Sequence, residues 1–227
     1  MKGERRSRGE PWPALLDNLR GQPDRSAALE RYARLSAHYE DSTARIRAVR
    51  RHVIDRLALR PGETVFDVAC GAGAMLPELA SRVESLGHVI GIEQSPQMAA
   101  LARRTTDGIG QVEILVSAAE GFVAPHRADA LAFVYTHDVQ QSPRALANVF
   151  AQARPGARVV VAGLQLLPWW GLPINAWVVW GARHYLTTWR GLRHPWALML
   201  GWCPDLRVVE RFHHGTSYVA TGTVRAP

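Results

Sequence analysis

The 227-residue chain contains little cysteine and almost no lysine. Its two cysteines, Cys70 and Cys203, are too few for a framework of several disulfides, which favours a reducing compartment. Lys2 is the only lysine, so the net charge of +7 comes from arginines that are spread along the chain. Because nucleic-acid binding usually needs a clustered basic surface, we expect no nucleic-acid partner.

Long uninterrupted apolar runs are also missing. The N-terminus carries Arg5, Arg6 and Arg8 where a signal peptide would have its apolar core. The most apolar stretch, 164–182, is interrupted by prolines, glycine and asparagine, and its helical part is too short to cross a bilayer. These absences predict a cytoplasmic protein. Contact of this stretch with a membrane surface stays open.

The order of the expected elements predicts an α/β fold. Strands are expected at 64–69, 88–93, 112–117, 129–135, 157–163, 206–212 and 217–225, and helices at 26–38, 42–59, 74–86, 95–105 and 142–154. Alternation with short loops predicts a parallel sheet covered on both faces, closed by two antiparallel strands. Residues 1–24 are expected to be flexible and 25–227 to form one domain, with an insertion at about 166–204 that contains two helices.

The segment 65–74 is the most informative part of the chain. It is typical of a buried strand that carries Asp67 and ends in a Gly-x-Gly turn, in which Gly71 and Gly73 let the backbone approach a nucleotide-like ligand. About twenty residues on, a second buried strand ends in the carboxylate of Glu93, the position from which such folds hold ribose hydroxyls. The pair predicts an adenosine-containing cofactor.

The details of the turn indicate which cofactor. A dinucleotide loop has a third glycine where this chain has Leu76, so a dinucleotide is disfavoured. The string from Asp67 through Cys70-Gly71 to Gly73 resembles the first motif of class I S-adenosylmethionine-dependent methyltransferases. Three further segments resemble later parts of the same fold in the right order: 91–98, 128–134 and 154–161.

The resemblance implies a Rossmann-like, seven-stranded mixed sheet with an N-terminal helical lid, and S-adenosylmethionine as the cofactor. Glu93 would accept hydrogen bonds from both ribose hydroxyls, and Met98 would pack on adenine or lie in the core. The family's adenine-binding acid aligns with alanine here, so Ser117, Glu120 or a backbone carbonyl would substitute. The implied cofactor-binding residues are Asp67, Ala69, Cys70, Gly71, Gly73, Glu93, Gln94, Met98, Ser117, Ala118, Ala119, Thr136 and Tyr39.

Catalytic residues are expected at 135–138, where the fourth strand ends, because ligands bind at the carboxyl ends of parallel strands. His137 is the predicted general base, and Asp138 would orient it or contact the substrate. The alternative is that both residues cap the next helix and touch only the cofactor. Much of the catalysis would come from holding the acceptor in line, for which proximity can supply ~7–11 kcal/mol.

The insertion is predicted to select the acceptor. It holds seven of the chain's eight tryptophans, and so much rigid aromatic area favours an apolar or aromatic acceptor. The alternatives are packing onto the sheet and a dimer interface. The predicted substrate-binding residues are Tyr32 and His38 of the lid, and Trp169, Trp170, Asn175, Trp180, Arg183, His184 and Tyr185 of the insertion.

These observations predict methyl transfer to a hydroxyl or activated carbon of a small apolar or aromatic metabolite, such as a quinone precursor or natural product. N-methylation of an amino lipid or small amine, a non-methylating rearrangement and a regulatory role stay open. A nucleic-acid methyltransferase is disfavoured, because 136–138 reads Thr-His-Asp instead of an Asn/Asp-Pro-Pro-Tyr-like motif. No metal site is expected. Peripheral membrane contact and a homodimer stay open.

Overall fold

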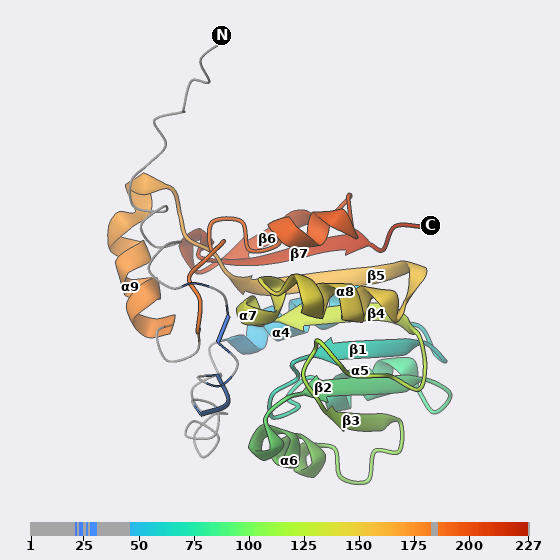
Figure 1. Cartoon of the computed structure of the whole chain (residues 1–227). Helices are drawn as coiled ribbons and strands as arrows, with labels where there is room; N and C mark the ends of the chain where they lie inside the picture. The colour runs from blue at the N-terminus through green and yellow to red at the C-terminus, as the bar shows by residue number, and fades with distance from the viewer. Residues whose placement is uncertain are drawn as a thin grey trace.

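The structure, a computed structural model, describes residues 21, 23–24, 26, 28–30, 46–182 and 186–226. Its centre is a seven-stranded sheet in the order β3-β2-β1-β4-β5-β7-β6 (Figure 1). The strands are β1 Thr64–Val68, β2 His88–Glu93, β3 Val112–Val116, β4 Ala128–Val134, β5 Ala153–Leu164, β6 Arg207–Phe212 and β7 Ser217–Thr223. The first five are parallel, and β7 runs antiparallel between β5 and β6. The predicted mixed sheet is confirmed.

Helices connect and cover the strands. The α-helices are α4 Arg47–Leu57, α5 Leu76–Val83, α6 Pro96–Thr105, α7 His137–Gln140, α8 Pro143–Ala151 and α9 Leu172–Ala182, and the 3-10 helices are η3 Trp169–Gly171, η4 Ala197–Gly201 and η5 His213–Gly215. Ser95 and Ser142 cap α6 and α8 with their hydroxyls, and a proline follows each cap. The lid expected from 26–38 and the start of the next helix lies largely outside the described residues.

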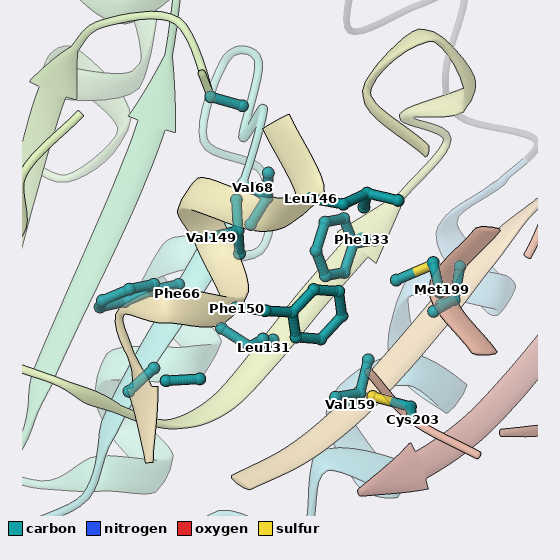
Figure 2. Close-up of a cluster of buried hydrophobic side chains, with 14 of the residues drawn as sticks. Phe66, Val68, Leu131, Phe133, Leu146, Val149, Phe150, Val159, Met199 and Cys203 are labelled. Carbon is teal, nitrogen blue, oxygen red and sulfur yellow. The ribbon is translucent and has the colours of Figure 1, made fainter. Parts of the chain in front are cut away.

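Side chains of the central strands alternate between two hydrophobic layers. Phe66 and Leu131 face the α8 side, where Figure 2 shows Phe133 next to Phe150, with their ring centroids 6.1 Å apart. Val65 and its neighbours on the other face pack against α4 and α5. Figure 1 shows α8 in front of the sheet and α4 behind it. Burial on both faces explains why these strands read as continuous apolar runs.

The sheet order reverses beside β1, and this places the site. From β1 the chain moves outward to β2 and β3, and then returns to add β4 and β5 on the other side. The loops that leave β1 and β4 therefore diverge at their carboxyl ends. In open α/β sheets this topological switch point is where ligands bind.

The insertion differs from the expectation. Only its first half forms an α-helix, α9, which begins with Pro173 in its first turn and follows the 3-10 turn η3. The second half contains η4, a single 3-10 helix of five residues, so the prediction of two helices is wrong. Gly191, with φ of 71°, and Pro195 interrupt the segment where a second helix would have formed. Figure 1 shows α9 beyond the carboxyl ends of the parallel strands.

The segment before Arg47 is joined to this insertion. The backbone amide of Asp24 donates to the Thr187 hydroxyl at 3.0 Å, and the Thr188 hydroxyl donates to the carbonyl of Gly21 at 2.7 Å. Gly21 and Asp24, which the sequence places in a flexible segment, therefore lie against Thr188 and Thr187. Among the described helices, none is long and apolar enough to cross a membrane.

Candidate functional site

The loop after β1 turns through conformations that favour glycine. Gly71 and Gly73 have φ of 60° and 80°, and Ala69 before them has φ of 56°. A Cβ added to Gly73 would lie 3.0 Å from the Cα of Ala102 on α6, so this glycine also permits close packing between loop and helix. The amide of Cys70 donates to the carbonyl of Ile92 at 3.0 Å, which joins the loop to β2.

Glu93, the last residue of β2, binds this loop through its side chain. One carboxylate oxygen accepts from the amide of Gly71 at 3.0 Å, and the other accepts from the amide of Ser95 at 2.7 Å. Burial raises the pKa of Glu93, and the backbone hydrogen bonds oppose that shift. A carboxylate offers about four lone-pair positions, so acceptor capacity remains for a ligand beside the Gly71 amide even with the backbone hydrogen bonds from Gly71, Ser95 and Gln94.

Asp67 lies on β1 behind the loop. It is almost wholly buried, and it does not line the cavity described below. Desolvation raises its pKa to about 7, while the positive charge of Arg50 on α4 opposes the shift and the charge of Glu93 adds to it. Its burial on β1 suits a role in organising the turn.

The strand end at β3 supplies a polar wall. The amide of Ser117 donates to the Glu93 carbonyl at 3.0 Å, which continues the ladder beyond β3. Ser117, Ala119 and Glu120 line the cavity, whereas Ala118 does not. The carboxylate of Glu120 accepts from the Ser142 hydroxyl at 2.9 Å. Glu120 directly follows Ala119 in this wall. It is thus the acidic residue beside the position where the resemblance would place an adenine-binding acid.

His137 stands at the end of β4, in the first turn of α7. It is 5% exposed and lines the cavity. Its Nε2 lies 2.8 Å from the carbonyl of Arg190, so Nε2 carries the proton and donates it. Its Nδ1 has no hydrogen-bond partner among the described residues. Burial lowers the pKa of His137 to about 4, so the ring is neutral at pH 7 and holds one unused acceptor.

Asp138 does not orient His137, and that part of the prediction is wrong. Its carboxylate accepts from the Thr187 hydroxyl at 2.5 Å, and from the amides of Thr187 and Thr188 at 3.2 and 3.4 Å. It therefore fixes the insertion to the end of β4 while also lining the cavity. The Arg190 carbonyl orients the imidazole instead, because the insertion folds back over α7.

These parts enclose a cavity of about 460 Å³ at the carboxyl ends of the strands. Its walls come from 92–94 at β2 and 134–139 at β4, together with Ala69 and Gly71 after β1 and Ser117, Ala119 and Glu120 after β3. Tyr135, directly after β4, has φ of 57°, a strained value for a bulky residue and typical of functional sites. The volume falls in the range of about 300–1,000 Å³ that is usual for small-molecule sites.

Several predicted residues lie elsewhere. Met98 is wholly buried on α6, and Cys70 and Gly73 are behind the cavity wall. Burial raises the pKa of the Cys70 thiol far above its usual range, so the thiol is inert. Among the other predicted cofactor residues, those in the cavity wall are Ala69, Gly71, Glu93, Gln94, Ser117, Ala119 and Thr136. Tyr32, His38, Tyr39, Arg183, His184 and Tyr185 lie outside the described residues.

The tryptophans of the insertion do not line the cavity, contrary to the prediction. Trp169, Trp170 and Trp180 are 61–65% exposed. Asn175 is buried, but its side-chain amide is bound to both backbone groups of Leu167 at 2.8 Å. The reason is the orientation of α9, which turns its small inner residues toward the protein and its indoles outward.

The structure adds cavity residues that sequence reasoning missed. Pro23, Asp24 and Ala28 precede the domain core, Ser142, Pro143 and Arg144 begin α8, and Leu186 belongs to the insertion. The Ser-Pro pair at 142–143 is a helix-start signature close behind the fourth strand, so it could have located that wall. No local signal marks 23–28 or Leu186, because only the tertiary contacts bring them here.

The fold and the site together define a doubly wound α/β protein with a ligand crevice at its switch point. Residues 65–156 match a family described as a methyltransferase domain. The chain is 32% identical over 142 residues to the 2-phytyl-1,4-naphtoquinone methyltransferase of Thermosynechococcus vestitus, which covers 58% of this chain and 62% of that protein. It is also 35% identical over 132 residues to an uncharacterized 37.1 kDa protein in transposon TN4556 of Streptomyces fradiae. That match covers 54% of this chain and 37% of the Streptomyces protein.

A solved structure shows the same fold. The O-methyltransferase family protein from Burkholderia thailandensis has a TM-score of 0.67 at 19% identity, over 95% of this chain and 68% of that one. The family match and the curated relative from Thermosynechococcus vestitus together support a class I S-adenosylmethionine-dependent methyltransferase. The chain spans less than two thirds of the length of the two curated relatives.

Proposed function

We propose that this protein transfers the methyl group of S-adenosylmethionine to a hydroxyl or activated carbon of a small apolar or aromatic metabolite. The observation that carries the proposal is the pairing of Gly71 and Glu93 across two strand ends on the wall of one cavity. This pairing places the Glu93 carboxylate, an acceptor, beside a loop backbone without side chains, in the arrangement that suits an adenosine ribose. The family match over 65–156 supports the same conclusion.

The residues present fit the cofactor. The Gly71 and Gly73 turn leaves a surface without side chains, and Glu93 retains acceptor positions for ribose hydroxyls. Ser117 and Glu120 lie one strand further along, at the side where the family binds adenine. Thr136 and the residues around it approach from β4. When bound, the cofactor supplies an electrophilic methyl group on a sulfonium.

His137 would act on the acceptor as a neutral hydrogen-bond acceptor. Its pKa of about 4 makes it a weak base, so it does not readily take a proton from an ordinary phenol, whose pKa is near 10. Its Nδ1 lone pair, unused among the described residues, can still accept a hydrogen bond from an O–H group and stabilise the positive charge that develops on that oxygen as it takes the methyl group. This chemistry favours an acceptor that is already nucleophilic, such as an activated ring carbon or an acidic hydroxyl.

The apolar part of the cavity wall supports an apolar acceptor. Val134, Val139 and Leu186 line the cavity together with His137. A planar ring would bury its faces against these side chains and use few polar contacts. The relative from Thermosynechococcus vestitus is named for a phytyl-naphthoquinone substrate, and this name supports a quinone precursor as the first acceptor to test.

Cofactor binding is the first experiment. A thermal-shift titration compares S-adenosylmethionine, S-adenosylhomocysteine and NAD. A ligand at about 100 times its dissociation constant stabilises a fold by about 2.7 kcal/mol, which raises the melting temperature measurably. We expect a shift with the first two ligands and none with NAD. A shift with NAD alone would overturn the cofactor assignment.

Product analysis then tests the reaction. The protein is incubated with S-adenosylmethionine and a reduced naphthoquinone, and the gain in product mass is compared with the S-adenosylhomocysteine that forms. Methyl transfer yields the two in equal amounts. Turnover of an acceptor without S-adenosylhomocysteine would instead indicate a rearrangement, and S-adenosylhomocysteine from an aliphatic amine but not from the quinol would indicate N-methylation.

A further inference from the structure

The outer side of α9 and η3 exposes a large aromatic surface. Trp169, Trp170, Trp177 and Trp180 are each 61–65% exposed, and Leu172 and Ile174 between them are also exposed. We call these six residues the tryptophan face. An indole covers about 150–250 Å² when it is buried, so the four expose on the order of 500 Å². Patches of that size on monomers usually mark a binding surface.

The helix beneath this face is apolar on both sides. Its inner residues Val178 and Ala182 pack in a small core with Leu166, Leu186 and Trp189. That core accounts for one side of α9 only. A helix with apolar side chains on every side is normally surrounded by apolar groups on every side. Here the described residues provide an apolar environment only on the inner side of α9.

The segment that carries the face has no acidic residue. No aspartate or glutamate occurs between Asp138 and Asp205, and the stretch 164–182 carries no charged residue at all. Arg190 is exposed and directly follows Trp189, which packs beneath α9. Exposed indoles on an acid-free segment, with the exposed Arg190 beside it, are complementary to an anionic surface that has an apolar interior.

The face also lies next to the cavity. Leu186 belongs both to the core beneath α9 and to the cavity wall, and its amide donates to the carbonyl of Ala182, the last residue of the helix. The distance along the chain from the helix end to the cavity wall is therefore only four residues.

We propose that the tryptophan face docks on the surface of an anionic lipid bilayer. Tryptophan is the side chain that favours the boundary between headgroups and acyl chains, since its ring is apolar and its N–H is polar. The exposed Arg190 adds attraction to anionic headgroups. The eleven-residue α9 lies in the interface and does not span it. Delivery of a membrane-dissolved acceptor to the cavity is a consequence that rests on the proposed function.

Vesicle co-sedimentation of the full chain tests the docking. The vesicles are made of phosphatidylcholine alone or of phosphatidylcholine mixed with phosphatidylglycerol, without cofactor or acceptor. We expect binding to the mixed vesicles that weakens as salt is added, and a shift of tryptophan emission to shorter wavelength on binding. W177A/W180A should bind at least about tenfold more weakly, because binding scales with buried apolar area.

The matched control is L86A/V123A. Leu86 and Val123 are 81% and 83% exposed and lie outside the face, so this variant removes two apolar side chains without touching it. It should bind vesicles like the parent protein. Arg190→Gln should weaken binding to the anionic vesicles only. Thermal unfolding of each variant verifies that the fold is retained.

Three results would overturn the proposal. One is that the parent protein does not bind vesicles even when they are in excess. Another is that W177A/W180A and L86A/V123A lose vesicle binding to the same extent. The third is a dimer, measured by light scattering, that W177A/W180A converts to a monomer while vesicle binding is unaffected, because the face would then join two copies of the chain. A protein that binds S-adenosylhomocysteine but no vesicles contradicts only the docking, whereas one that binds vesicles but neither ligand contradicts only the proposed function.

Discussion

Glu93 accepts a hydrogen bond from the amide of Gly71, 3.0 Å away, and thereby joins the ends of two neighbouring parallel strands. The carboxylate is buried, and the backbone amides of Gly71 and Ser95 both support its charge. A single side chain thus binds the loop and lines the cavity. Changes at Glu93 should accordingly affect both the loop and the binding of the cofactor.

Glu93→Gln keeps the size of the side chain and removes its charge. Hydrogen bonds to charged groups contribute about 1.5–3 kcal/mol, so we expect the affinity for S-adenosylhomocysteine to fall by about tenfold or more. Titration calorimetry measures the change. Glu113→Gln is the control, because Glu113 is an exposed acid on the neighbouring β3 and should bind normally. Equal affinity of both variants would remove Glu93 from the binding site.

Gly73→Ala tests the close packing of the loop on α6. The new Cβ would meet the Cα of Ala102 at 3.0 Å, in addition to the strain of a residue at φ of 80°. Gly108→Ala is the matched control, since Gly108 has φ of 76° and open space around it. We expect the free energy of unfolding to fall by about 1–2 kcal/mol in the control and by more in Gly73→Ala. Urea unfolding of both variants measures the difference.

His137→Ala should separate catalysis from binding. The substitution removes the acceptor at Nδ1 but leaves Glu93 and the loop after β1 intact. We expect affinity for S-adenosylhomocysteine to be retained, and kcat to fall by about ten- to a hundredfold, the value of one hydrogen bond made in the transition state. Steady-state kinetics with the acceptor found by product analysis measures this. Unchanged kcat would exclude His137 from the mechanism.

His137 should contribute less to stability in acid. Its pKa is lowered from 6.5 to about 4, so below pH 6.5 the unfolded chain binds a proton that the folded protein does not bind. The contribution of His137 to the free energy of unfolding should therefore decrease by about 3 kcal/mol as pH drops from 6.5 to 4, and it is measured as the difference between the parent protein and a His137 variant. His137→Gln should lack this decrease in urea unfolding, whereas His194→Gln, which removes an exposed imidazole, should keep it.

Asp67 should act in the opposite direction. Its pKa is raised from 3.8 to about 7, so between these values the folded protein holds a proton that the unfolded chain has released. Stability should therefore be lost as pH rises through this window, by up to about 4 kcal/mol. Asp67→Asn should remove that loss, and Asp107→Asn, at an exposed position, should not. A pH series of urea unfolding curves distinguishes the two variants.

Much of the fold could be predicted because its signals are local. The strand at 88–93 and the Gly-x-Gly turn are encoded in short windows in which apolar runs, glycines and a terminal acid follow one another. Ser95-Pro96 and Ser142-Pro143 likewise mark the helix starts that the structure shows. The place of Glu93 beside Gly71 follows from adjacent parallel strands, whose carboxyl ends meet at one edge of the sheet.

The sequence by itself determined the parallel sheet, the cofactor loop and the acid that faces it, because each depends on backbone conformation within a short window. Only the tertiary structure decided that Arg190 orients His137, that Asp138 holds the insertion, and that Gly21 and Asp24 contact Thr188 and Thr187. These contacts join segments about 50 to 170 residues apart, for which no local pattern exists. It also decided that the indoles of α9 face outward, since a helix that is apolar all round has no polar face from which its orientation could be inferred.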